Sequence, residues 1–186
     1  MNVLYPALDT KPTGLLRLLF AREVFDLDSG HSIPHPRGIT PIEGLAPPHT
    51  PKNVAERWAG LWAARELAYA EDAIGRATTA PPLPEPPAED DPWSAEAIAS
   101  EAFERAFFSW SWPLREAGKS FDREKADGVR EAIAHESGKG LRAIIVLPLS
   151  APYVSRPSTA GLIIPDWVRE RPAAYRKALL GTGHPG

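Results

Sequence analysis

The sequence predicts a single α+β domain over residues 1–186, in which three to four helices pack on a small, mostly apolar sheet. Three apolar segments, 15–25, 141–147 and 161–164, have the composition of strands. Two other segments, 50–77 and 94–112, carry apolar side chains at helical spacing. The helical region separates the first strand segment from the other two, which favours an α+β fold over a regular α/β alternation.

The first apolar segment, "TGLLRLLFAREVFDL" at 13–27, is assigned to a strand over 15–25. Its apolar residues occupy both faces of a period-two pattern, with Arg17 and Glu23 as interruptions. The turn-forming stretch "DLDSG" at 26–30 supports the end of a strand there. A helix remains an alternative, because short apolar runs do not separate the two periods.

A proline-rich loop over 29–51 and an acidic, proline-rich linker over 78–92 interrupt the regular elements. The loop contains six prolines, which remove backbone donors and bias their neighbours toward extended conformations. Loops longer than about 15 residues are uncommon in compact domains and are usually lids, binding arms or disordered segments. The linker is expected to be an extended spacer within one domain.

The segment 50–77 is the clearest helix, with Thr50 as a candidate N-cap and Pro51 at the first helical position. One stripe of this helix is apolar: Val54, Trp58, Leu61, Trp62 and Tyr69. A further helix is expected from near Asp122 to a stop at Gly138. A last helical region should run from Asp166 to Leu180 with a break at Pro172, and 151–161 is expected to be a hairpin loop between the two C-terminal strands.

The stretch "FFSWSW" at 107–112 places four aromatic residues in six positions at the end of the 94–112 helix. On a helical wheel, Phe103, Phe107 and Trp110 share one side, whereas Phe108 and Trp112 point to the other. The second side is either sandwiched against another helix or exposed for a partner, and a cofactor-stacking platform is a further alternative. We predict Phe108 and Trp112 as partner-binding residues, because aromatic side chains anchor protein interfaces.

Composition excludes several kinds of chemistry. Cysteine is absent, so disulfides, thiolate zinc sites and cysteine nucleophiles are excluded. The Gly-x-Ser-x-Gly motif of α/β-hydrolases is also missing. The net charge of −3, without a basic stripe, disfavours nucleic-acid binding. Neither a membrane-spanning apolar run nor a signal peptide is visible, which favours a cytoplasmic location.

Three of the five histidines, His31, His35 and His49, lie in the proline-rich loop. Imidazoles are common metal ligands, and a carboxylate such as Asp28 or Glu43 would complete a zinc or iron site. The intervening prolines prevent the helical arrangement that usually brings two such histidines together. A metal site under the 29–51 loop is therefore the alternative interpretation.

These observations predict a non-catalytic interaction, assembly or regulatory protein of bacterial or phage type. No cofactor is expected, and the partner would be another protein or a second copy of the chain. The alternative function is a small metal-dependent enzyme that uses the histidines of the 29–51 loop. The bacterial origin rests on composition, since arginine outnumbers lysine and alanine is abundant.

Overall fold

The structure is a computed structural model that describes residues 6–9, 12–26, 33–39, 54–77, 101–117, 122–126 and 128–181. Within these ranges the chain forms an α+β fold with a mixed, four-stranded sheet, as predicted. The helices are α1 (Thr13–Val24), α2 (Val54–Ala77), α4 (Glu101–Ala117), the 3-10 helix η2 (Asp122–Lys125), α5 (Val129–Gly138), α6 (Asp166–Arg169) and α7 (Pro172–Leu180). The strands are β1 (Ala7–Asp9), β2 (Ala143–Leu147), β3 (Ser155–Ser158) and β4 (Gly161–Pro165).

The sheet has the strand order β1-β2-β4-β3. Strand β2 is parallel to both of its neighbours, β1 and β4, while β3 is antiparallel to β4. Every residue of the two central strands is buried, which explains why both read as continuous apolar runs. The two strands predicted at the C-terminal end of the chain are confirmed.

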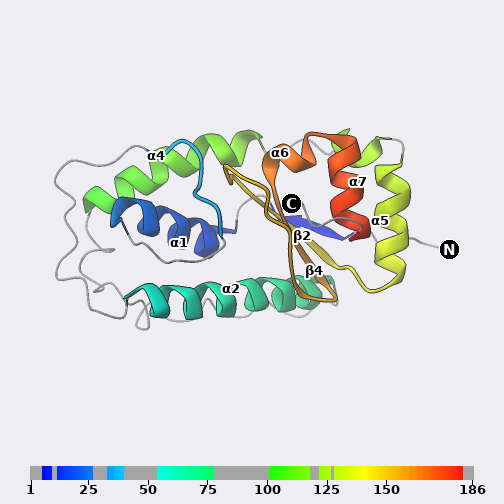
Figure 1. The fold of residues 1–186 in the computed structure, drawn as a ribbon, viewed down its shortest axis with the longest axis horizontal. Coiled ribbons are helices and arrows are strands. Elements are labelled where there is room, and N and C mark those ends of the chain that lie inside the picture. Colours follow the sequence, from blue (N-terminus) through cyan, green and yellow to red (C-terminus); the bar gives the residue numbers. More distant parts are fainter. Residues whose placement is uncertain are drawn as a thin grey trace.

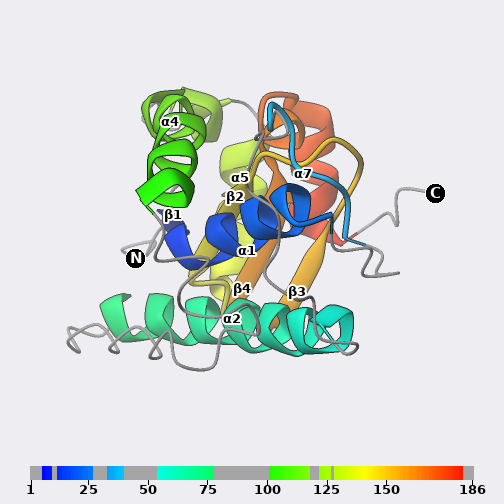
Figure 2. The ribbon, with the colours of Figure 1, turned by 90° about the vertical axis from the view of Figure 1, so that its left-hand side faces the viewer.

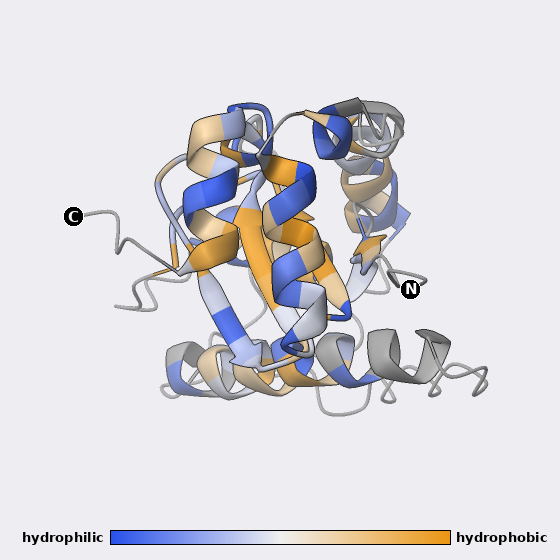
Figure 3. Cartoon of the chain, turned by 90° about the vertical axis from the view of Figure 1, so that its right-hand side faces the viewer, coloured by the Kyte–Doolittle hydropathy of each residue, from blue (hydrophilic) through white to orange (hydrophobic). Residues whose placement is uncertain are grey.

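The central strands separate two hydrophobic clusters, because successive side chains of a strand point to opposite faces. One cluster joins Ile145, Leu147 and Ile163 to α1, α2 and α4. The other joins Ile144 and Ile164, among others, to α5, α6 and α7. Figure 1 shows these two helical layers on opposite sides of the sheet, and Figure 3 shows the apolar strands behind α5 and α7, whose outer faces are more hydrophilic.

The strand predicted over 15–25 is wrong, since residues 15–24 belong to α1 and Phe25 is its C-cap. Its apolar residues are buried over most of the helix circumference, with exposures of 0–3% for Leu15, Leu16, Leu18, Leu19 and Phe20. Only Thr13, Arg17, Glu23 and Val24 of this helix are partly exposed, so its polar face is too narrow to reveal the helical period and the periodicity was ambiguous. The missing strand is instead β1 at 7–9, which pairs with β2 through the register Leu8 to Ile144.

The hairpin predicted over 151–161 is wrong as a link between the two C-terminal strands, because β2 and β4 are parallel. The segment contains β3, which itself forms a hairpin with β4. Pro157 lies in β3 at the edge of the sheet, where a missing backbone donor is tolerated.

The helix predicted over 50–77 is confirmed in its described part, Val54–Ala77. Trp58 and Trp62 are buried and stack with ring centroids 5.4 Å apart. The predicted helix from Asp122 to Gly138 is interrupted at Gly128, whose φ of 78° is left-handed, and α5 then ends at Gly138 as expected. The break at Pro172 is confirmed, since α6 ends at Arg169 and α7 begins at Pro172.

The proline-rich loop is described at 33–39, where it forms an isolated antiparallel bridge between Pro36 and Leu149. Outside the described residues lie the linker 78–92 and the rest of the 29–51 loop. The predicted helix starts at 50–53 and 94–100 also fall outside them.

Candidate interaction surface

Helix α4 buries one aromatic side against α1. Phe103 and Phe107 are 0% and 4% exposed. The ring of Phe20 meets both edge-on, with centroids 5.2 and 5.6 Å away, and Phe25 stacks on Phe103 at 5.9 Å. This confirms the predicted core side of the aromatic stretch, and these contacts fix how α4 is rotated on the domain.

The opposite side of α4 carries Phe108 and Trp112 outside the core. Their exposed fractions are 54% and 50%, and their ring centroids lie 5.3 Å apart at an interplanar angle of 33°. The sandwiched interpretation of this side is therefore wrong for the described residues, because no described element covers the pair. We call Phe108 and Trp112 the aromatic pair.

The turn of α4 that precedes the aromatic pair is charged. Arg105 forms an ion pair with Glu101, four residues earlier, and both side chains are largely exposed. Residues 101, 105, 108 and 112 follow one another along one side of a helix. The outward side of α4 thus consists of a charged turn followed by two aromatic rings.

Helix α4 continues to Ala117 although Pro113 lies inside it. Proline has no backbone N–H, so the carbonyl of Ser109 receives no hydrogen bond from that position. The helix expected over 94–112 therefore extends past Pro113, which does not end it.

A third exposed large apolar residue, Leu67, lies on α2 with 43% exposure. In Figures 1 and 2, α1 lies between α2, the helix of Leu67, and α4, the helix of the aromatic pair. Leu67 is a single exposed apolar side chain, which is normal for a protein surface and serves as an internal comparison.

The described part of the proline-rich loop is fastened to α1 by Arg22. The guanidinium group is buried and donates hydrogen bonds to the carbonyls of Ile33 and Pro34, at 2.9 and 2.8 Å, and lies over the ring of Trp58. Burial lowers the pKa of Arg22, and the neighbouring carboxylate of Glu23 opposes that shift. Sequence reasoning missed this residue, because only Arg17 and Glu23 were noted within the apolar run and Arg22 was given no role.

Of the three histidines in the alternative metal site, the structure describes only His35. His35 is exposed, and its Nδ1 lies 2.7 Å from Oε1 of Glu23. Both His31 and His49 lie outside the described residues, as do Asp28 and Glu43. In the part of the chain that the structure describes, no group of three histidine or carboxylate side chains is arranged to hold a metal ion. The metal interpretation remains a prediction that depends on the undescribed histidines.

A buried carboxylate on α2 was also missed by the sequence. Glu66 is 8% exposed and accepts hydrogen bonds from the Tyr153 hydroxyl at 2.7 Å and from the Ser155 hydroxyl at 3.3 Å. Burial and the bond to Glu66 raise the pKa of Tyr153 to about 12. A tyrosine held in its neutral form as a donor suits a structural link between α2 and the β3 hairpin.

No protein-family model, curated protein or solved structure matches the chain.

Proposed function

We propose that the chain is a non-catalytic interaction protein that binds another protein, or a second copy of itself, through the aromatic pair on α4. The observation that carries this proposal is the contrast within one helix. Phe103 and Phe107 are buried, whereas Phe108 and Trp112 are about half exposed. An assembly or regulatory role of bacterial or phage type, in the cytoplasm, belongs to the same proposal and rests on the sequence.

Energetics support a partner on this side. Covering apolar surface is worth about 25 cal/mol per Å², and large aromatic rings expose much of it. Tryptophan is among the residues most often found at the energetic centre of interfaces. The rings of Phe108 and Trp112 contact each other, so they form one joint apolar feature. Such a feature on an exposed helix suits insertion into an apolar groove of a partner.

The charged turn next to the aromatic pair suits the rim of such an interface. Glu101 and Arg105 form an exposed ion pair, which gives orientation more than affinity. A partner that covers the rings would therefore leave this pair at the solvent-exposed edge.

No described helix is both long and apolar enough to cross a lipid bilayer.

The test compares the double variant Phe108→Ser/Trp112→Ser with Leu67→Ser, which removes an exposed apolar residue elsewhere. Sedimentation velocity of each purified protein measures self-association. Expression of each protein with a tag in the native cells shows whether a second protein is isolated with it. We expect an assembly in the wild type and in Leu67→Ser that is lost in the double variant. An assembly that survives in the double variant, or wild-type protein that is monomeric and isolated without a partner, contradicts the proposal.

A stability measurement separates loss of binding from loss of folding. Trp112→Ala should lower the free energy of unfolding by less than about 1 kcal/mol, since surface substitutions have small effects. Phe107→Ala, on the buried side of the same helix, should lower it by about 3–5 kcal/mol. Urea denaturation measures both. A loss of several kcal/mol for Trp112→Ala would place that ring in the core and remove the basis of the proposal.

A further inference from the structure

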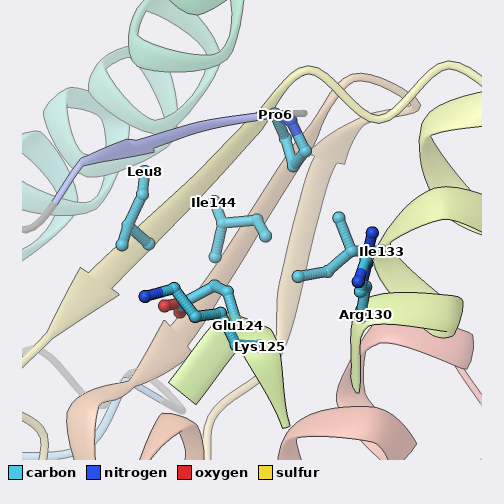
Figure 4. A pocket seen from close by; sticks show the side chains of 7 residues that line it. All are labelled: Pro6, Leu8, Glu124, Lys125, Arg130, Ile133 and Ile144. Atoms are coloured by element: carbon cyan, nitrogen blue, oxygen red, sulfur yellow. The ribbon is translucent and has the colours of Figure 1, made fainter. Parts of the chain in front are cut away.

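A pocket of about 320 Å³ lies beside the short edge strand β1, on the face of the sheet away from α4. Its lining comes from four elements and the residue before β1, and Figure 4 shows the seven side chains around it. They are Pro6, Leu8, Glu124, Lys125, Arg130, Ile133 and Ile144. A volume of this size is at the lower end of the range for small-molecule sites, about 300–1,000 Å³.

The inner wall of the pocket is apolar. Leu8 and Ile144 are register partners on the adjacent strands β1 and β2, and their side chains therefore lie on the same face of the sheet. Ile133 approaches from α5, as Figure 4 shows. Ile133 and Ile144 are each 1% exposed, while Leu8 is half-buried. The pocket therefore marks the margin of the hydrophobic cluster under α5 and α7.

The charge of the one acidic lining residue is balanced by a buried cation. Glu124 accepts hydrogen bonds from Arg169 Nε at 2.7 Å and from Nη2 at 3.0 Å, and Arg169 is 4% exposed. This paired geometry directs the carboxylate charge of Glu124 toward the protein interior.

Two exposed cations, Lys125 and Arg130, supply the remaining charges of the lining. Both also take part in interactions within the chain, so a ligand would share or replace those contacts. Apolar walls with a basic rim are complementary to a molecule that has an apolar body and one anionic group.

We propose that this pocket binds a small amphipathic carboxylate, such as a medium-chain fatty acid. Its apolar body would lie against Leu8, Ile133 and Ile144, and its carboxylate would lie at the rim that carries Lys125 and Arg130. This site is independent of the aromatic pair, because α5 and α4 lie on opposite faces of the sheet.

The first experiment compares two probes with the same chain and opposite charge, octanoate and octyltrimethylammonium. Both are titrated into uniformly ¹⁵N-labelled protein below their micelle concentrations, and backbone amide shifts are recorded. Octanoate should shift the amides of 7–8, 124–126 and 130–133 in a saturable way. Octyltrimethylammonium should bind about tenfold more weakly, because Lys125 and Arg130 would repel its cationic head, whereas they attract the carboxylate of octanoate. Equal binding of both probes, or octanoate shifts confined to other residues such as 108–112, overturns the proposal.

The second experiment removes the charges of the rim. Lys125→Gln and Arg130→Gln should each weaken octanoate binding about two- to fivefold, the effect of one solvent-exposed ion pair. Lys177→Gln on α7, an exposed lysine outside the lining, is the matched control and should bind octanoate like the wild type. Unchanged binding in both rim variants, or equal weakening in the Lys177 control, overturns the proposal. None of these outcomes bears on the aromatic pair, whose test uses different residues.

Discussion

The indole N–H of Trp110 donates a hydrogen bond to the backbone carbonyl of Arg37, with an Nε1–O distance of 3.0 Å. This bond ties α4 to the described part of the proline-rich loop, 73 residues earlier in the chain. The loop is held on its other side by the strand-like bonds from the Arg37 amide to the Pro148 carbonyl and from the Ser150 amide to the His35 carbonyl. The aromatic residues of α4 therefore have three separate roles: Phe103 and Phe107 pack in the core, Trp110 binds the loop, and the aromatic pair faces outward.

Replacing Trp110 with phenylalanine keeps an aromatic ring but removes the donor to Arg37. The free energy of unfolding should fall by about 0.5–1.5 kcal/mol, the net contribution of one hydrogen bond. Hydrogen exchange at the Arg37 and Ser150 amides should become faster, because the loop loses one of its fastenings. Trp112→Phe is the control on the outward side of the helix and should leave both exchange rates unchanged. Unaltered exchange in Trp110→Phe would show that the bond does not hold the loop.

Replacing Arg22 with methionine should lower the free energy of unfolding by roughly 2–3 kcal/mol, because it leaves the carbonyls of Ile33 and Pro34 without their charged donor. The matched control is Arg17→Met on the same helix, where the arginine lies over the Phe103 and Phe107 rings and pairs with an exposed carboxylate. That change should cost less than about 1 kcal/mol. Urea denaturation of the two variants gives both values, and equal losses would contradict the anchoring role of Arg22.

Tyr153 makes the stability of the domain sensitive to alkaline pH. Its pKa is raised to about 12 in the folded protein, against about 10 for an unperturbed tyrosine. The folded state therefore holds the phenolic proton more tightly, so this contribution is complete below pH 10 and is lost as the pH rises toward 12. Unfolding free energies of the wild type and of Tyr153→Phe should differ most below pH 10, and the difference should shrink between pH 10 and 12. A difference that stays constant over that interval would contradict the assignment.

Gly128 and Gly60 should respond to alanine in opposite directions. Gly128 has a φ of 78° between η2 and α5, and a Cβ there would lie 3.4 Å from Cδ of Arg176. Gly128→Ala should therefore lower the free energy of unfolding by roughly 1–2 kcal/mol, the cost of a left-handed residue with a side chain. Gly60 lies within α2, and no atom lies within 4 Å of the position that an alanine Cβ would take. Gly60→Ala should therefore raise the free energy of unfolding by about 0.5–1 kcal/mol. Thermal and urea denaturation of the two variants test the contrast.

The elements that were predictable carry a hydrophobic pattern that identifies them from their own residues. Strands β2 and β4 are buried on both faces, so their apolar runs could be recognised as strands without knowing which segments pack against them. Helix α2 buries one side only, and the spacing of Trp58 and Trp62 reveals that side. The break at Pro172 follows from the geometry of proline itself.

The elements that were mistaken depend on contacts that are distant in the chain. Helix α1 is buried over most of its circumference, so it lacks the broad polar face that would have distinguished it from a strand. Strand β1 has only three residues and is defined by its pairing with β2, more than 130 residues later in the numbering. The parallel arrangement of β2 and β4 depends on how the segment between them folds back as β3, which no local signal specifies.

By itself the sequence determined that Phe108 and Trp112 point away from Phe103 and Phe107, because the helical repeat sets that direction from local backbone geometry alone. Because the sequence has no cysteine, it also excluded disulfides, thiolate zinc sites and cysteine nucleophiles. Only the tertiary structure decided which aromatic side is covered, since that depends on α1 bringing Phe20 and Phe25 against α4. The same holds for the pocket at β1: its walls come from segments around positions 8, 125, 133 and 144, and only folding brings these together.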